Sequence, residues 1–153
     1  MSVTQDGQLG ERFIMNFLHS RGNEAYQLDC IWQDHKTGIL YFGEVKTKSL
    51  KYNINGFIGH GADKPQLDSR MKIQNEWLHI RVVMFFVDKD EECIYWNYLD
   101  NLYSLDDTPI RKTCDYIITS SNIIVFPLDS LHKISLTHEQ YIYFCREWNN
   151  TRR

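Results

Sequence analysis

Apolar side chains recur at helical spacing close to the N-terminus. Leu9, Phe13 and Phe17 stand four positions apart, which places them on one face of a helix. Gly22 follows this stripe, and glycine readily adopts the left-handed conformation that ends many helices. Residues 5–20 are therefore predicted to form a helix that faces the core.

The next two apolar segments predict a β-hairpin. Residues 26–32 alternate weakly between apolar and polar side chains, and residues 39–48 begin as an apolar run. The turn-forming segment 34–38 separates them and ends in glycine. In such a hairpin Asp29 precedes the turn and Glu44 follows it, so the two carboxylates can meet across adjacent strands. Their repulsion would favour a cation between them. The alternative is that Asp29 caps or solvates a strand edge.

Glycine and asparagine dominate the segment after the hairpin. Residues 53–64 contain three glycines and two asparagines, with His60 among them. This composition predicts a flexible loop next to the candidate site, and such loops often carry function. Asp63 and Pro65 then predict the start of a helix, as an N-cap and a first-turn proline. The inner face of that helix is expected to carry Leu67, Met71, Gln74 and Leu78.

The rest of the chain is predicted to add strands and a final helix. Residues 81–88 form a nearly continuous apolar run, as in a central strand covered on both faces. Other strands are expected at 92–99, 116–119 and 123–126, with turn-like sequence at 100–115. Thr137 and Gln140 form a capping box before a helix whose apolar face holds Tyr141, Phe144, Cys145 and Trp148. This order predicts a single α/β domain over residues 1–153, with a mixed central β-sheet flanked by helices.

Length and composition are those of an ordinary globular domain. The 153 residues are 42% apolar and 24% charged, which argues against disorder. No apolar run is long enough to cross a membrane, and the polar N-terminus lacks a signal-peptide pattern. The four cysteines are scattered without metal-ligand spacing, as expected of reduced structural thiols. We therefore expect a cytoplasmic protein with no membrane partner.

Basic residues are concentrated in one part of the chain. The net charge is −3, but residues 44–72 contain six lysines and arginines against three acidic residues. A phosphate backbone would be attracted to such a cluster. The alternative is an ordinary solvated face, which is common for a cluster of this size.

The segment Glu44-Val45-Lys46 carries the candidate chemistry. In a strand, Glu44 and Lys46 point to one face and Val45 to the other. A carboxylate can hold a hard cation, and a neighbouring ammonium can orient a water or stabilise a developing anion. The alternative is a solvated ion pair at the end of a strand, which is the more common meaning of an isolated Glu-x-Lys.

Taken in order, these elements resemble the PD-(D/E)xK nuclease superfamily, and most of all the archaeal Holliday junction resolvases and related phage and restriction-type nucleases. The resemblance rests on Gly7-x-x-Gly10-Glu11 in the first helix, Asp29 at the hairpin, Glu44-Val45-Lys46 at a strand end and Gln66 at the start of a helix. Leu28 stands where the superfamily often has proline. The resemblance implies a restriction-endonuclease-like core over about residues 5–88, with additional strands and a C-terminal helix over about 91–150.

The resemblance also implies a metal site. Asp29, Glu44 and the backbone carbonyl of Val45 would bind Mg²⁺ or Mn²⁺, with Glu11 as a further ligand that can lie in the outer shell. Oxygen ligands suit a hard cation of this type. A rival register takes Asp34 as the metal-binding aspartate. It is less favoured, because Asp34 begins the turn and would lie away from Glu44.

Catalytic and DNA-contacting roles follow from the same resemblance. Lys46 would position the attacking water or stabilise the transition state, and Gln66 would orient Lys46, the water or the phosphate. Contacts to the DNA backbone, which give register without sequence, would come from Lys48, Lys51, His60, Lys64 and Arg70. His60 is also a candidate general base, but a single histidine without a spaced partner is more often a backbone contact or a solvent-exposed residue.

The implied activity is metal-dependent hydrolysis of DNA by an endonuclease that acts on branched or structured DNA, as Holliday junction resolvases do in recombination and repair. A homodimer is expected, because cutting two strands requires two sites. One alternative is a restriction- or recombination-associated nuclease that cuts linear or single-stranded DNA. Another is a non-catalytic nucleic-acid-binding module with the same fold.

Overall fold

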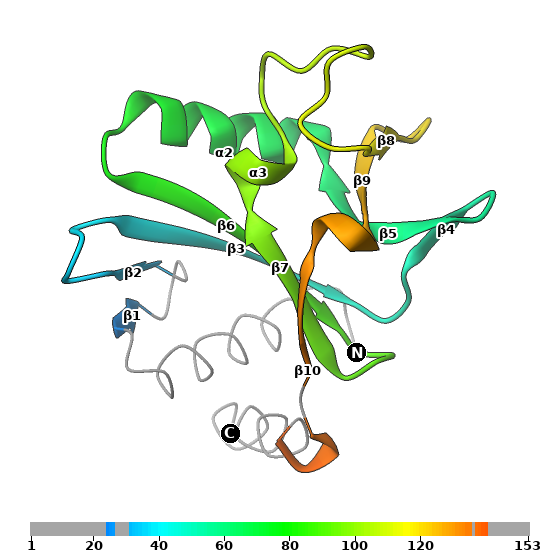
Figure 1. Ribbon diagram of the computed structural model, residues 1–153, viewed down its shortest axis with the longest axis horizontal. Helices are drawn as coiled ribbons and strands as arrows, with labels where there is room; N and C mark the ends of the chain where they lie inside the picture. Colours follow the sequence, from blue (N-terminus) through cyan, green and yellow to red (C-terminus); the bar gives the residue numbers. More distant parts are fainter. Residues whose placement is uncertain (1–23, 27–30, 136, 141–153) are drawn as a thin grey trace.

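The computed structural model describes residues 24–26, 31–135 and 137–140. The predicted helix over residues 5–20, with Glu11, lies outside these ranges, and so do Asp29 and Cys30. Within the described residues the fold is mixed α/β, built mainly from strands in two sheets with few helices (Figure 1). None of the helices in the described ranges is long and apolar enough to cross a membrane.

The larger sheet contains the strand that carries the candidate chemistry. Its strands lie in the order β1-β2-β3-β6-β7-β10. Their bounds are Glu24–Tyr26, Ile31–Gln33, Leu40–Lys48, Ile80–Asp88, Cys93–Tyr98 and His132–Ser135, respectively. β3 and β6 are parallel over nine pairs, from Leu40 opposite Ile80 to Lys48 opposite Asp88. All other neighbours in this sheet are antiparallel.

The smaller sheet is entirely antiparallel and has the order β4-β5-β9-β8. Its strands are Tyr52–Ile54, Phe57–Asp63, Ile123–Pro127 and Ile117–Ile118, respectively. In Figure 1 it lies at the right, at the opposite end of the fold from β1 and β2. The segments β4 and β5 come before β6 in the chain, whereas β8 and β9 come near its end. This sheet therefore joins the two halves of the sequence.

Helix α2, Lys64–Glu76, connects β5 to β6 and runs along the larger sheet (Figure 1). Its start agrees with the sequence, since Asp63 occupies the N-cap position and Pro65 follows in the first turn. Leu67 and Met71 are buried, as expected. The expectation for Leu78 is wrong: the helix ends at Glu76, and Leu78 is 88% exposed.

Two short helical segments complete the description: α3, Leu99–Leu102, and the 3₁₀ turn η1, Leu128–Ser130. Residues 138–140 are helical, and their capping box is present. The Thr137 hydroxyl accepts from the Gln140 N–H at 3.1 Å, and the Gln140 side chain accepts from the Thr137 N–H at 3.0 Å. The apolar face predicted beyond it, from Tyr141 to Trp148, lies outside the described residues.

The predicted strand over residues 26–32 is instead two short strands. β1 pairs antiparallel with β2, with Glu24 opposite Gln33 and Tyr26 opposite Ile31, so the chain reverses between them. The turn that follows β2 agrees with the sequence. Gly38 has φ +75°, and the Asp34 side chain accepts from the Lys36 N–H at 2.9 Å.

The predicted flexible loop over residues 53–64 is also wrong, because these residues form the β4–β5 hairpin. Asn55 and Gly56 turn the chain with φ values of +52° and +88°. An Asn-Gly pair between apolar residues is a known hairpin signal. The remaining glycines lie within β5, where they allow β5 to approach β9 closely: a Cβ on Gly61 would lie 2.2 Å from the Ile124 carbonyl oxygen.

One apolar core lies between α2, β6 and the smaller sheet. Val82, Met84 and Phe86 point from β6 toward α2, and Ile124 and Phe126 reach the same cluster from β9. The opposite face of β6 is buried as well, and there Phe85 contacts Trp32 at a ring distance of 5.9 Å. The apolar run of residues 81–88 thus forms a central strand covered on both faces, as predicted.

We predict that Gly61→Ala destabilises the fold strongly. The added methyl group would clash with the backbone of Ile124, which β9 holds in the sheet, at a cost of roughly 3 kcal/mol in the free energy of unfolding. Urea denaturation followed by circular dichroism measures this change. Gly56→Asn is the matched control, because a Cβ there meets open space and asparagine tolerates a positive φ. Equal stability of the two variants would contradict the close approach of β5 and β9.

Candidate functional site

The C-terminal half of β3 presents Glu44 and Lys46 on one face of the sheet. Strand alternation directs Val45 to the opposite face, where it is buried. The parallel register places Glu44 beside Met84 and Lys46 beside Phe86. Since Met84 and Phe86 belong to the core under α2, Glu44 and Lys46 lie on the face of the sheet that α2 covers.

Helix α2 brings an amide and a guanidinium to this face. Gln66 bridges the two strand residues, because its Nε2 donates to Glu44 Oε1 at 2.7 Å and its Oε1 accepts from Lys46 Nζ at 2.5 Å. One turn later, Arg70 Nε donates to the other oxygen, Glu44 Oε2, at 2.8 Å. The Arg70 guanidinium also lies 5.0 Å from the centre of the Phe42 ring. The spacing of four residues puts Gln66 and Arg70 on one helix face.

The charges of this cluster are partly shielded from water. The Glu44 side chain is 12% exposed, compared with 24% for Lys46 and 26% for Arg70. Lys46 Nζ lies 3.7 Å from Glu44 Oε1, so the Glu44 carboxylate has cations on two sides and an amide donor. A carboxylate at this depth requires such partners, because burial of an unpaired charge is costly. Lys46 retains ammonium protons for a further acceptor.

A polar hollow of about 540 Å³ opens beside Lys46 and Gln66. Asp63 and Pro65 line it from the start of α2, and Ser121 and Asn122 line it from the turn between β8 and β9. Ser121 and Asn122 were not predicted from the sequence, because sheet pairing between β5 and β9 brings them there. We call this space the catalytic-side hollow, because Lys46, a candidate catalytic residue, lines it.

The residues present fit a hard divalent cation only in part. Glu44 supplies one carboxylate next to the Val45 carbonyl, and Mg²⁺ is commonly held by one or two carboxylates with retained waters and substrate phosphates. Both oxygens of Glu44 already accept hydrogen bonds, so a cation would have to replace at least one of these donors. The other expected ligands, Asp29 and Glu11, lie outside the described residues. The rival residue Asp34 is in the turn after β2.

The register of the hairpin bears on Asp29. β2 pairs with β3 so that Ile31 lies opposite Phe42 and Gln33 opposite Leu40. Each step toward the N-terminus in β2 corresponds to one step toward the C-terminus in β3. The described pairing ends at Ile31 opposite Phe42, and the expected meeting of Asp29 with Glu44 remains a prediction.

The five expected DNA-contacting residues divide into two groups. Lys48 and Lys64 are partly exposed: Lys48 Nζ donates to the Tyr52 hydroxyl at 3.4 Å, and Lys64 pairs with Asp68 at 2.8 Å. The other three are engaged within the protein. Arg70 binds Glu44, Lys51 binds the buried Asp88 and the more exposed Glu91, and His60 has no exposed surface.

The expected backbone contact from His60 does not fit its place in the structure. His60 lies on β5, stacked on Phe86 at a ring distance of 5.5 Å, and its Nε2 is 2.8 Å from Asp88 Oδ2. Lys51 Nζ lies 2.8 Å from the same Asp88 oxygen and 2.6 Å from Glu91 Oε2. These residues form a buried charge network that joins the two sheets.

Electrostatics in this network favour a neutral histidine and an ionised aspartate. Burial lowers the pKa of His60, and the hydrogen bond to Asp88 offsets only part of that effect. Burial raises the pKa of Asp88, but hydrogen bonds from Lys51, the Glu91 N–H and His60 outweigh it and hold the pKa below its usual value. His60 Nε2 therefore donates to Asp88. Its buried Nδ1 has no hydrogen-bond partner among the described residues, so a second ring proton would lack an acceptor.

Asp88, Glu91 and Cys93 lie close enough together to share a cation. The Lys51 ammonium already occupies the space between the two carboxylates. Burial raises the pKa of the Cys93 thiol to about 11, which keeps it in the protonated form that binds metals poorly. In this cluster the Lys51 ammonium, and not a metal ion, therefore compensates the charges of Asp88 and Glu91.

No protein-family model and no curated protein matches the chain.

We predict that acid weakens the fold through His60. The folded state lowers the pKa of His60, so below about pH 6.5 the unfolded chain binds a proton that the folded protein does not. The free energy of unfolding should therefore fall as the pH decreases below about 6.5, with a slope from His60 of at most about 1.4 kcal/mol per pH unit, and this loss ends once His60 is also protonated in the folded protein. The loss linked to Asp88, whose folded pKa is lowered, comes only below about pH 4.

Denaturation of His60→Gln at pH values from about 7 to about 4 tests this assignment. Glutamine can donate one hydrogen bond to Asp88 but cannot be protonated, so the loss of stability that begins near pH 6.5 should become smaller. His132→Gln is the control, because it makes the same change at an exposed histidine of β10. This variant should retain the wild-type dependence of the free energy of unfolding on pH. An unchanged slope in His60→Gln would refute the role of His60.

Proposed function

We propose that this chain is a metal-dependent DNA endonuclease with a restriction-endonuclease-like core. The single observation that carries the proposal is the row Glu44–Gln66–Lys46, in which one amide bonds both a carboxylate and an ammonium beside an open polar hollow. Phosphodiester hydrolysis needs a carboxylate for a cation and a cationic group near the attacking water. An ordinary surface ion pair would not need the bridging amide from another element.

The arrangement of elements also supports the proposal. Glu44 and Lys46 lie in the C-terminal half of β3, which is parallel to β6. Gln66 lies in the first turn of α2, the helix that precedes β6 in the chain. In open α/β sheets, ligands bind preferentially at the carboxyl ends of parallel strands. A phosphate in the catalytic-side hollow would lie at such an end, next to the Lys46 ammonium.

In this mechanism Glu44, Asp29 and the Val45 carbonyl would hold Mg²⁺ or Mn²⁺, with Glu11 as a further ligand. When bound, the cation would polarise the scissile phosphate and lower the pKa of a coordinated water. Lys46 would orient the attacking water or stabilise the charge that develops on phosphate oxygens. Gln66 Oε1 accepts a hydrogen bond from Lys46 Nζ and so orients its ammonium group. The substrate is branched or structured DNA, cut by a homodimer.

A second candidate function is a non-catalytic nucleic-acid-binding module. One observation favours it: Arg70 already neutralises Glu44, so the structure is electrostatically satisfied by its own side chains. In the enzyme, by contrast, a cation must compete with Arg70 for the carboxylate. The response of the protein to metal therefore separates the two candidates.

We predict Mg²⁺- or Mn²⁺-dependent cleavage that depends on Glu44 and Lys46. A four-way junction, a linear duplex and a single strand are incubated with metal or with EDTA and resolved on denaturing gels. Glu44→Gln and Lys46→Ala should each reduce the cleavage rate at least about 100-fold, as expected on loss of a charged group in a catalytic site. Glu76→Gln and Lys72→Ala change exposed residues of α2 and should retain the wild-type rate. If no substrate is cleaved, the nuclease proposal is refuted and the non-catalytic binding module is the candidate that stands.

We further predict that Arg70→Ala raises the affinity for Mn²⁺ about tenfold, because the cation no longer competes with a charged hydrogen bond worth roughly 1.5–3 kcal/mol, and 1.4 kcal/mol is about a factor of ten. Isothermal titration calorimetry measures the affinity directly, and thermal unfolding in EDTA and in Mn²⁺ provides a second readout. Without metal the variant should be less stable than the wild type, because Glu44 loses a charged donor. Arg81→Ala removes another arginine–carboxylate pair, with Asp100 at 3.0 Å, and should not change metal affinity. If both variants respond alike to metal, Glu44 is not a ligand.

A further inference from the structure

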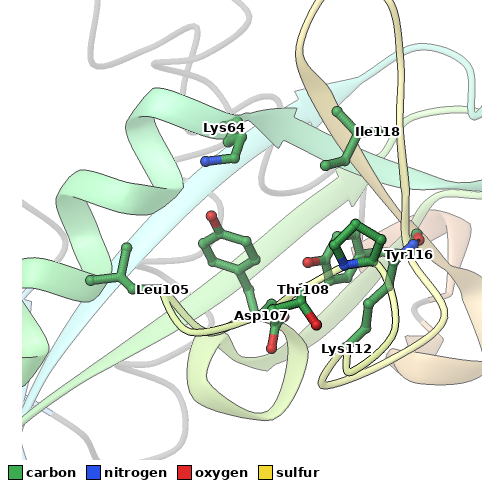
Figure 2. Close-up of a pocket in the computed structure, with 9 residues that line it drawn as sticks. Lys64, Leu105, Asp107, Thr108, Lys112, Tyr116 and Ile118 are labelled. Atoms are coloured by element: carbon green, nitrogen blue, oxygen red, sulfur yellow. Dashed lines mark hydrogen bonds between the residues drawn. The ribbon is translucent and has the colours of Figure 1, made fainter.

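A second hollow lies near the catalytic-side hollow, and the two share supporting elements. It has a volume of about 250 Å³ and lies between Lys64 of α2, Ile118 of β8 and the segment 103–116. Figure 2 shows Lys64 and Ile118 along its upper side and Leu105, Asp107 and Thr108 below. The first turn of α2 and the β8–β9 hairpin contribute residues to both hollows. We call this second space the apolar hollow.

The junction between the two hollows is fixed by backbone hydrogen bonds. The Lys64 N–H donates to the Asn122 carbonyl at 3.0 Å, which ties the start of α2 to the β8–β9 turn. Within that turn the Asn122 N–H donates to the Thr119 carbonyl at 3.0 Å, and the Thr119 N–H donates to the Ile123 carbonyl at 2.9 Å. These backbone hydrogen bonds therefore hold the two hollows in a fixed position relative to each other.

The apolar hollow combines apolar walls with cations. Tyr103 and Tyr116 are almost completely buried and form its base, whereas Leu105 and Ile118 are 36% and 49% exposed. Lys64 and Lys112 also line the hollow. The Lys64 ammonium donates to Asp68, whereas the Lys112 ammonium donates to the Tyr116 carbonyl and also lies 4.7 Å from the centre of the Tyr116 ring. Each ammonium has further protons to donate.

We propose that a single DNA strand crosses the junction, with its scissile phosphate in the catalytic-side hollow and an adjacent unpaired base in the apolar hollow. This inference rests on the proposed nuclease function and extends it to the substrate. The base would contact Leu105 and Ile118, and Lys64 and Lys112 would face the flanking phosphates. The substrate class is therefore DNA with an unpaired nucleotide next to the cut.

Size and chemistry favour a base over other occupants. Pockets for drug-sized ligands measure roughly 300–1,000 Å³, so a hollow of about 250 Å³ suits a single ring system. Proteins hold unstacked bases between apolar and aromatic side chains, and lysines supply the backbone attraction. Asp107 at the apolar hollow and Asp63 at the catalytic-side hollow oppose a polyanion, so the strand would pass on the lysine side of each. A base inside a duplex cannot enter, because it is stacked and paired.

Fluorescence anisotropy in EDTA, where the metal-dependent reaction is absent, tests the proposal with a labelled single strand and a duplex of equal length. Ile118→Asp should weaken binding of the single strand about tenfold, within the range for loss of one stacked base, and leave duplex binding unchanged. The matched control is Ile110→Asp, which places the same charge on a 93% exposed isoleucine of the neighbouring segment and should bind both DNAs as the wild type does. Equal effects of the two variants would overturn the proposal.

An abasic scan tests the same point by changing the DNA instead of the protein. Single strands that lack one base at successive positions are compared for binding, and for cleavage with Mn²⁺. One position next to the cut should lose affinity about tenfold in the wild type, and that loss should disappear in Ile118→Asp. Cleavage with no sensitive position would overturn the base contact but leave the nuclease intact. A wild-type protein that neither binds nor cuts any DNA would overturn both.

Discussion

The parallel pairing of β3 with β6 is the constraint on which the candidate site depends. Parallel neighbours require a long connection between the end of one strand and the start of the next. Here that connection contains β4, β5 and α2. It returns the chain over the face of the sheet that carries Glu44 and Lys46. Gln66 and Arg70 reach these two residues only because α2 crosses there.

The network around His60 holds β5, within the connection between β3 and β6, against the end of β6. His60 belongs to the smaller sheet and Asp88 to the end of β6, and both side chains are fully buried. Such a pair is retained only where the charged carboxylate is satisfied, because unpaired buried charge is strongly unfavourable. Lys51 and the Glu91 N–H complete the partners of Asp88. The smaller sheet is thereby held against the larger one, and the β8–β9 turn is held beside α2.

Glu44 illustrates how a carboxylate proposed as a metal ligand can be stable without metal. Arg70, Gln66 and Lys46 together compensate its charge at a depth where it is only 12% exposed. The same donors would have to yield if a cation bound, so the affinity for metal would depend on the strength of the Arg70 pair. Folding and the proposed function thus make opposite demands on one side chain, as is common at functional sites.

The sequence by itself determined the features that depend on local periodicity. The apolar run of residues 81–88, the start of α2 at Asp63 and Pro65, and the turn ending at Gly38 all follow from local rules. The shared face of Glu44 and Lys46 is also local, because alternation in a strand needs no knowledge of the rest of the fold. The sequence order further suggested Gln66 as a neighbour of Lys46, and the two are in contact.

Only the tertiary structure decided which polar residues are interior. Glycines in the segment 53–64 predicted a loop, but pairing with β9 made it a strand and buried His60. Arg70 and Lys51 were expected to face DNA, yet they pair with Glu44 and Asp88. Ser121 and Asn122 reached the candidate site through the same sheet. These outcomes depend on contacts between residues far apart in the chain, and such contacts leave no periodic signal in the sequence.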